Sequence, residues 1–215
     1  IYATNRINRL TATMPIKSSS RQSRSDATGQ QILEATVECI YKYGYVGATL
    51  SVIAGHANVT RGALQHHFGN RRIDLMQEAA EYLYDIYFDQ FVPLIGGSDP
   101  RQTLSNIWQL QKTLFKQRET KVLIEIWVAC HSDGELAEKI LPLFKKLDAS
   151  LEEEWLSRFV PAGLAPDAIQ QLRYLQRTML RGAAVEHLIS SDDKVFYELF
   201  DLADKMTASY FLNTK

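Results

Sequence analysis

The side chains best suited to bind a charged, hydrogen-bonding partner lie within residues 58–72, a stretch that contains three arginines, two histidines and no acidic residue. In the major groove of DNA, arginine makes paired hydrogen bonds to guanine, and glutamine makes them to adenine. Arg61, Gln65 and His66 are therefore the candidates for contacts with bases. Histidine near neutral pH binds phosphate either as a hydrogen-bond donor or as a cation. The candidates for phosphate contacts are Thr49, Thr60, His67, Arg71 and Arg72.

Two short helices joined by a tight turn would position these side chains. Residues 50–57 place their apolar side chains at the spacing of one helical face, with Thr49 before them as an N-cap. Asn58 tolerates the left-handed backbone that ends this helix, and Thr60 caps the next one, residues 61–68. Only a narrow edge of the second helix is apolar. This pattern is typical of a helix-turn-helix, whose second helix packs by its back and presents polar side chains.

Gly62 lies in the first turn of this second helix, where glycine costs about 1 kcal/mol relative to alanine. One explanation is the close approach of a DNA backbone. The other is relief of crowding against the first helix. We favour the first explanation and count Gly62 among the residues expected at the DNA surface.

The stretch from about Arg24 to Leu75 resembles the amino-terminal signature of the tetracycline-repressor (TetR) family of bacterial transcription regulators. The residues that carry the resemblance are, in order, Ile32-Leu33-Glu34-Ala35, Gly44-Tyr45, Thr49, Ile53-Ala54, Ala57-Asn58-Val59-Thr60, Gly62-Ala63-Leu64 and His67-Phe68. In two places the chain departs from the family. Gln65-His66 replaces the tyrosine usual before the His-Phe pair, which leaves that tyrosine's phosphate contact without a counterpart, and Asn58 replaces the usual turn glycine. The resemblance implies an all-α fold, with an N-terminal three-helix helix-turn-helix domain and a C-terminal helical domain for ligand binding and dimerisation.

Charge is distributed unevenly along the chain. Up to Ile73 there are nine basic and three acidic residues, and the remainder has 15 basic and 22 acidic residues. A basic N-terminal segment followed by an acidic remainder indicates that the N-terminal segment binds phosphates. We expect a disordered basic arm over residues 1–23, a DNA-binding domain over 24–72 and a ligand-binding and dimerisation domain over 73–215.

The arm offers two further hypotheses. Met14 is a candidate native start, which makes residues 1–13 an added segment. Arg21 and Arg24 either reach the DNA as an arm or belong to a solvated tail.

Apolar periodicity predicts about nine helices and no sheet. Besides the two short ones, helices are expected at about 26–43, 71–91, 99–115, 119–131, from Gly134 onward, 167–190 and 193–212. Pro93 is expected to end one of them, and Pro142 to kink or break another. The segment Val122-Leu123-Ile124-Glu125-Ile126-Trp127-Val128-Ala129-Cys130 is apolar nearly all round, which predicts a buried helix.

Glu125 is the lone carboxylate of that apolar segment, so it needs a partner or exposure to solvent. Lys121, one turn earlier, is the favoured partner. The alternative is a cationic or hydroxylated ligand in a pocket. The candidate ligand-binding residues are Tyr82, Tyr87, Trp108, Glu125 and Trp127.

The last two helices, about 167–190 and 193–212, carry apolar stripes and the small residues Gly182-Ala183-Ala184. The family resemblance implies that two such hairpins form the four-helix interface of a homodimer. Alternatively, the stripes close the core of a monomer.

Enzymatic motifs are missing: the sequence has no Glu-x-x-His pair, glycine-rich phosphate loop, nucleophile elbow or zinc-ligand spacing. His131 and Glu135 form the best metal pair, and a lone pair is weak. We therefore expect no enzyme, catalytic residue, cofactor or metal. No run of 18 apolar residues occurs, and Cys39 and Cys130 are far apart, so we expect a reduced, cytoplasmic protein without a membrane partner.

The leading hypothesis is a dimeric, ligand-responsive transcription regulator. It would repress by binding a double-stranded operator with inverted half-sites, until an unidentified small-molecule effector releases it. An activator is an alternative, because the direction of regulation depends on where the operator lies. A helical adaptor that binds protein instead of DNA is the other alternative, which the charge distribution disfavours.

Overall fold

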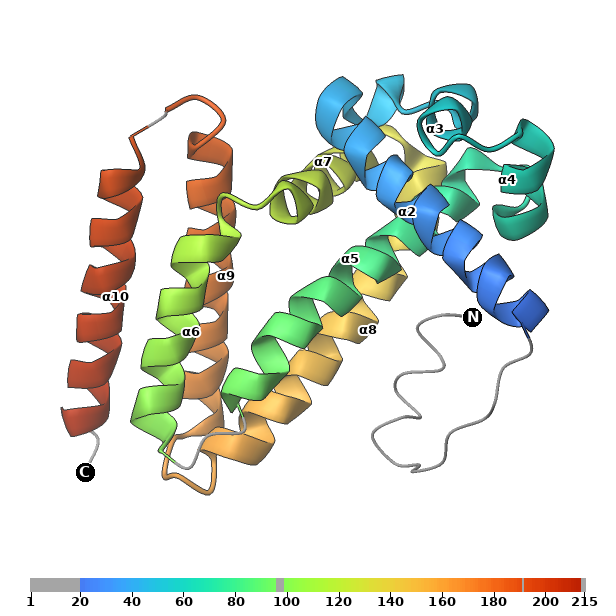
Figure 1. Ribbon diagram of the computed structural model, residues 1–215. Coiled ribbons are helices and arrows are strands. Elements are labelled where there is room, and N and C mark those ends of the chain that lie inside the picture. The colour runs from blue at the N-terminus through green and yellow to red at the C-terminus, as the bar shows by residue number, and fades with distance from the viewer. Residues whose placement is uncertain (1–19, 96–98, 191, 214–215) are drawn as a thin grey trace. The chain divides into compact units, whose positions relative to one another are not determined.

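The computed structural model describes residues 20–95, 99–190 and 192–213, which form nine helices and no strand (Figure 1). In chain order they are α2 (Ser20–Gly47), α3 (Leu50–His56), α4 (Arg61–Phe68), α5 (Arg72–Ile95), α6 (Pro100–Leu114), α7 (Arg118–Ser132), α8 (Gly134–Phe159), α9 (Pro166–Glu186) and α10 (Asp193–Asn213). The all-α prediction is confirmed. None of the helices in these ranges is long and apolar enough to cross a membrane.

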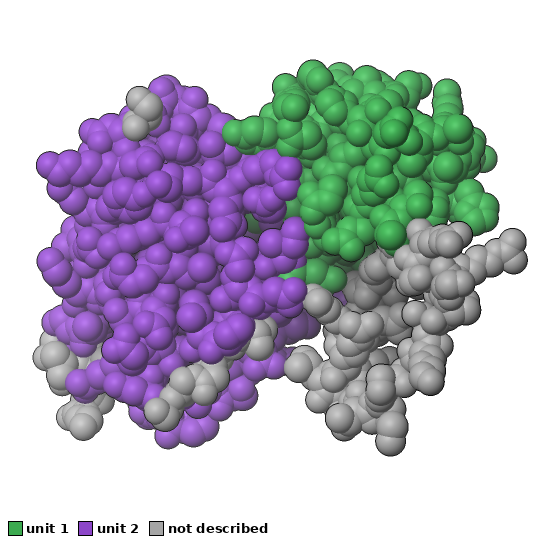
Figure 2. Space-filling model, viewed as in Figure 1, with its two compact units in different colours: residues 1–85, 125–143 green, residues 86–124, 144–215 purple. Residues whose placement is uncertain are grey.

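The chain divides into two compact units (Figure 2). The first consists of Ile1–Asp85 and Glu125–Leu143, and the second of Ile86–Ile124 and Phe144–Lys215. The first unit contains the whole expected DNA-binding segment, 24–72, and adds parts of α5, α7 and α8. The expected domain limit at residue 72 stays a prediction.

The helix-turn-helix of the first unit forms through the predicted caps. The hydroxyl of Thr49 accepts the backbone N–H of Val52 at 3.3 Å, and that of Thr60 accepts the N–H of Ala63 at 3.1 Å. Asn58 has the left-handed φ of 50° that the turn requires. The core beneath these helices contains the buried side chains of Ile32, Leu33, Val37, Ile40, Ile53, Ala54, Leu64, Leu75, Met76 and Ala79.

Helix α2 differs from its prediction at both ends. It begins at Ser20, six residues before the expected start, and residues 1–19 of the expected arm lie outside the described residues. Gly44 interrupts the helical backbone with φ 70° and ψ 172°, directly after the expected helix end at residue 43. A further helical turn then extends to Gly47.

The second unit has a core of two apolar clusters. The first contains Phe91, Leu104, Ile107, Trp155, Phe159, Ile169 and Leu172. The second contains Trp108, Leu114, Phe115, Leu180, Ala184, Phe196, Phe200 and Ala203. Helix α6 contributes to both clusters and packs beside α9 and α10 (Figure 1). It begins close to the expected position, with Asp99 as its N-cap and Pro100 in its first turn.

One predicted helix end is wrong, because α5 continues through Pro93 to Ile95. Helix α8 continues through Pro142 to Phe159, so it does not break there, and the alternative of a kink stays a prediction. A proline removes one backbone hydrogen bond, and the packing of long apolar faces outweighs that loss. In α8 the side chains of Trp155 and Phe159, which lie beyond the proline, are buried, and their packing stabilises the part of the helix that follows the proline.

The prediction of a helix buried all round is also wrong. Helix α7 buries Val122, Ile126 and Cys130, which recur every fourth residue on one face. Val128 and Glu125 are exposed to solvent. Apolar composition alone does not decide burial, because an exposed valine is common on protein surfaces.

Candidate nucleic-acid interface

Helix α4 presents the side chains predicted to read bases. Leu64 is fully buried and anchors the helix, while Arg61 and His66 are exposed and Gln65 is partly exposed. Residues four positions apart lie on the same side of a helix, so Arg61 and Gln65 share one strip of surface. The structure therefore leaves all three predicted base-contacting residues accessible and places Arg61 and Gln65 on one side of α4.

Gly62 has open space around its Cα atom. A Cβ added there would lie 3.9 Å from the hydroxyl of Thr60, an ordinary van der Waals distance, with no other neighbour within 4 Å. Crowding against α3 therefore does not explain the glycine. The close approach of a DNA backbone to Gly62 stays a prediction.

The predicted phosphate-binding threonines are exposed caps. Each hydroxyl accepts a backbone N–H and still has its own hydrogen to donate. Thr49 and Thr60 can therefore hold the N-termini of α3 and α4 and donate to a phosphate at the same time. His67 is partly exposed at the end of α4.

Arg71 and Arg72 have different environments. The exposed Arg71 forms an ion pair with Glu135 of α8, the acidic member of the His131–Glu135 pair that was dismissed above as a metal site. The guanidinium of Arg72 lies 4.0 Å from the ring centre of Tyr45 and donates to the backbone carbonyls of Tyr45 and Ala48. Arg72 thus holds the connection between α2 and α3. Phosphate contacts of both arginines stay predictions.

Tyr45 bonds two acidic residues that lie far from it in the sequence. The sequence analysis named Tyr45 only as part of the family resemblance and predicted neither contact. Its backbone N–H donates to Glu125 at 2.9 Å, and its hydroxyl donates to Asp133 at 2.8 Å. Burial, and then the bond to Asp133, raise the pKa of Tyr45 to about 12. The N–H of Leu136, and then the Tyr45 hydroxyl, lower the pKa of Asp133. An aspartate directly before a predicted helix start was the available signal for Asp133, because aspartate is a preferred N-cap.

The five predicted ligand-binding residues divide between the two units. In the first unit the Tyr82 hydroxyl donates to Glu34, Glu125 accepts the N–H of Tyr45, and Trp127 is partly buried. In the second unit burial raises the pKa of Tyr87 to about 12, and the indole N–H of Trp108 donates to the hydroxyl of Thr207 at 3.0 Å. A single pocket formed by all five stays a prediction.

Known proteins resemble this chain in sequence and in fold. The family model described as bacterial regulatory proteins, tetR family, matches residues 32–78. The HTH-type transcriptional regulator CymR of Pseudomonas putida is 24% identical over 184 residues, which are 85% of this chain and 90% of CymR.

Among solved structures, a transcriptional regulator from Rhodococcus has a TM-score of 0.68 at 20% identity and covers 83% of this chain and 94% of its own. The regulator FadR from Bacillus subtilis, solved in complex with stearoyl-CoA, has a TM-score of 0.65 at 18% identity and covers 84% of this chain and 97% of its own. The described helices carry the matched segment from α2 into α5, with the caps and the left-handed turn in place. Residues 32–78 therefore match the TetR family of bacterial regulatory proteins, and the family resemblance expected from the sequence is confirmed over this segment.

Proposed function

We propose that this TetR-family, DNA-binding regulator of transcription acts as a homodimeric repressor, which a small molecule releases from an operator with inverted half-sites. The observation that carries the proposal is the outer face of α4, which offers Arg61, Gln65 and His66 from a helix anchored by the buried Leu64. No acidic residue occurs between positions 58 and 72. Because this surface has no negative charge, it can enter a major groove without electrostatic repulsion from the DNA phosphates.

The proposed roles follow from side-chain chemistry and position. Arg61, Gln65 and His66 contact base edges, because their groups match those edges and all three are accessible on α4. Gly62 lets the DNA backbone approach. The side chains proposed to contact phosphates are those of Thr49, Thr60, His67, Arg71 and Arg72.

Dimerisation is supported by apolar side chains that α9 and α10 leave exposed. In α10 the buried Phe196, Phe200 and Ala203 pack in the unit's core, whereas Leu199, Leu202 and Met206 are exposed. Tyr174, Leu175 and Val185 of α9 are exposed as well. The same hairpin thus closes its own core and keeps a second apolar face, which a partner's hairpin would cover in a four-helix arrangement.

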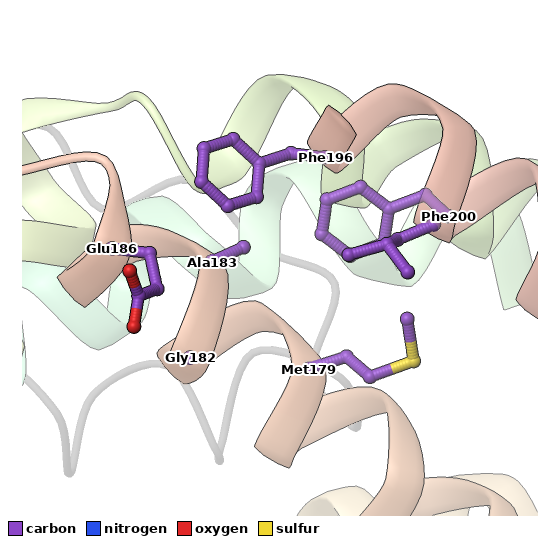
Figure 3. Close-up of a pocket in the computed structure, with 7 residues that line it drawn as sticks. Met179, Gly182, Ala183, Glu186, Phe196 and Phe200 are labelled. Carbon is purple, nitrogen blue, oxygen red and sulfur yellow. The ribbon is translucent and has the colours of Figure 1, made fainter. Parts of the chain in front are cut away.

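A hollow of about 230 Å³ lies within this apolar face, between α9 and α10 (Figure 3). Met179, Gly182, Ala183 and Glu186 line it from α9, and Phe196, Leu199 and Phe200 line it from α10. A side chain added at Gly182 would meet nothing within 4 Å, so this part of the face is open. We propose that side chains of the second subunit fill the hollow.

Release by a small molecule is supported by FadR, which was solved with stearoyl-CoA bound. Repression is supported by NalD of Pseudomonas aeruginosa, which has a TM-score of 0.61 at 20% identity and is the secondary repressor of an efflux pump. A ligand can release the protein only by binding the DNA-free conformation more tightly than the DNA-bound one. An activator would use the same contacts, and the position of the operator relative to the promoter distinguishes the two.

The proposal is tested by fluorescence anisotropy with DNA from upstream of the protein's own gene and with a scrambled fragment, over a series of salt concentrations. The wild type should prefer the upstream fragment, with an affinity that falls steeply with salt. The variant Gln65→Ala, His66→Ala should lose the preference. A matched control, Gln170→Ala, His131→Ala, changes the same residue types at exposed positions on α9 and α7 and should keep it. Equal affinity for both fragments would mean that the operator lies elsewhere or that α4 is not sequence-specific, and no DNA binding at low salt would contradict the proposal.

A further inference from the structure

A single helical turn, residues 45–48, joins α2 to α3 and leads directly into Thr49. Gly44 separates this turn from the rest of α2 with its φ of 70°. A helical turn leaves its first N–H groups and its last carbonyls without partners of its own, and one isolated turn is unstable in water. Side chains from elsewhere in the chain must therefore hold it in place.

Two carboxylates from the junction of α7 and α8 hold the start of the turn. Glu125 accepts the backbone N–H of Tyr45 at 2.9 Å, and Oδ2 of Asp133 accepts the Tyr45 hydroxyl at 2.8 Å. The other oxygen of Asp133 accepts the N–H of Leu136 at 3.0 Å, which fixes this carboxylate at the first turn of α8. Tyr45 is only 6% exposed, and a phenylalanine would fill the same space. The hydroxyl therefore adds a fixed position to the burial of the ring.

A cation from α5 holds the end of the turn. Arg72 donates to the backbone carbonyls of Tyr45 and Ala48, the second at 3.0 Å, and its guanidinium lies 4.0 Å from the centre of the Tyr45 ring. Ala48, directly before Thr49, is fully buried. The turn thus has acids at its N–H end and a base at its carbonyl end, which is the arrangement that complements a helix dipole. Such charge-assisted hydrogen bonds are among the stronger ones in proteins.

The position of Thr49 depends on this turn. Its exposed hydroxyl accepts the N–H of Val52 at 3.3 Å and keeps its own hydrogen for a phosphate. A hydrogen bond weakens steeply when its atoms move out of line. Ile53 and Ala54 are buried and anchor α3 one turn further on. A small displacement of the turn would therefore remove a phosphate contact of Thr49 without unfolding α3.

We propose that Glu125 and Asp133 are positioning residues for DNA binding, which act through Tyr45 to place the Thr49 hydroxyl at the phosphate backbone of the operator. Both carboxylates lie outside the expected DNA-binding segment, residues 24–72, and outside residues 32–78, which match the family model. DNA affinity thus depends on the junction of α7 and α8, although neither carboxylate touches the DNA. This role rests on the proposed function, in which Thr49 contacts a phosphate.

A double-mutant cycle tests whether Tyr45 acts through Thr49. The duplex is the inverted repeat that the wild type enriches from a random pool, and fluorescence anisotropy measures the affinity. Tyr45→Phe removes the hydroxyl alone, and Thr49→Ala removes the proposed phosphate donor, so each should weaken binding by about threefold to tenfold. Because both remove the same contact, the double variant should bind about as weakly as the weaker single variant. Two effects that multiply, or a Tyr45→Phe variant with wild-type affinity, would overturn the positioning role.

Tyr82→Phe is the matched control for the cycle. The Tyr82 hydroxyl also donates to a carboxylate within the first unit, that of Glu34, but this bond joins α5 to the middle of α2. Any effect of Tyr82→Phe on DNA affinity should therefore multiply with that of Thr49→Ala. Urea denaturation in the binding buffer checks that each variant is folded, so that a loss of affinity reports on the contact and not on unfolding.

Glu125 provides a second test, in which the sign of the effect decides. Glu125→Ala removes a negative charge, which alone would strengthen binding to DNA, and also removes the acceptor of the Tyr45 N–H. The variant should bind at least about threefold more weakly than the wild type. Glu125→Gln keeps an acceptor oxygen and should bind as tightly as the wild type or more tightly. Stronger binding by both variants would overturn the positioning role, because Glu125 would then act through its charge alone.

The selection from the random pool separates this role from the proposed function. If the wild type enriches an inverted repeat and the effects in the cycle multiply, the positioning role alone is refuted. If the wild type enriches no common sequence, the proposed function is refuted, and the positioning role with it.

Discussion

The carboxylate of Glu125 accepts the backbone N–H of Tyr45 at 2.9 Å, across 80 positions of the sequence. The bond falls directly after Gly44, the residue whose positive φ interrupts α2. The same carboxylate oxygen lies 3.1 Å from the point where a Cβ of residue 44 would lie. Gly44 and Glu125 therefore form one local arrangement, in which the absence of a side chain lets the carboxylate reach the backbone.

Gly44→Ala should destabilise the protein by about 1–3 kcal/mol, because φ 70° and ψ 172° suit glycine alone and the new methyl group would press on Glu125. Urea denaturation measures the change. Gly55→Ala is the control, because Gly55 is a helical glycine with open space around it and should gain up to about 1 kcal/mol. Equal effects of the two substitutions would refute the strained role of Gly44.

Glu125→Ala should leave the Tyr45 amide without an acceptor, so that amide should exchange its hydrogen faster with solvent. Hydrogen exchange followed by NMR reports on it residue by residue. Glu125→Gln keeps an acceptor oxygen and should retain most of the protection. If both variants exchange at the wild-type rate, the bond does not hold this segment.

Tyr45 should make stability sensitive to high pH. Its folded-state pKa of about 12 lies above the ordinary value of 10.0, so its contribution is fully present below pH 10 and is lost as the pH rises through about 12. Tyr45→Phe should remove that part of the decline between pH 10 and 12, as measured by urea midpoints. Tyr87, whose pKa is also raised to about 12, remains in both proteins and provides the common background. Parallel pH curves for wild type and variant would contradict this assignment.

Gly62→Ala should preserve stability or raise it by about 0.5–1 kcal/mol, because the site has room and alanine favours the helix. DNA affinity should nevertheless fall by about tenfold, equivalent to about 1.4 kcal/mol, as the methyl group meets the DNA backbone. Gly134→Ala, at an exposed helix start on α8, should change neither property appreciably. If Gly62→Ala binds DNA with unchanged affinity, Gly62 does not lie against the DNA backbone.

Leu202→Asp with Met206→Asp should convert the dimer into a monomer, because the two carboxylates would lie in the apolar face proposed to meet the second subunit. Light scattering after size-exclusion chromatography measures the mass. Val128→Asp changes an equally exposed apolar residue, 65% exposed on α7, and should leave the dimer intact. A dimeric double variant would place the interface elsewhere.

Local features of the fold were predictable from the sequence. The caps at Thr49, Thr60 and Asp99 depend on side chains that reach backbone N–H groups two or three residues away. The turn at Asn58 and the interruption at Gly44 depend on the backbone preferences of single residues. These signals lie within one turn of chain, so a single sequence contains them.

Contacts between distant segments were not predictable in the same way. Nothing near Arg72 indicates that its guanidinium binds the carbonyls of Tyr45 and Ala48, and nothing near Glu125 indicates Tyr45. The continuation of α5 and α8 through their prolines has the same cause, because packing partners far along the chain stabilise both sides of each proline.

Selection from a random pool of duplex DNA tests the central claim most directly, because it does not depend on where the operator lies. The pool is enriched over several rounds by the wild type and, in parallel, by the Gln65→Ala, His66→Ala variant. The wild type should enrich an inverted repeat whose half-sites are centred about one helical turn, or a multiple of it, apart. The variant should lose bases within each half-site while keeping the spacing. Enrichment of no common sequence by the wild type would contradict the account of α4 as a sequence-reading helix.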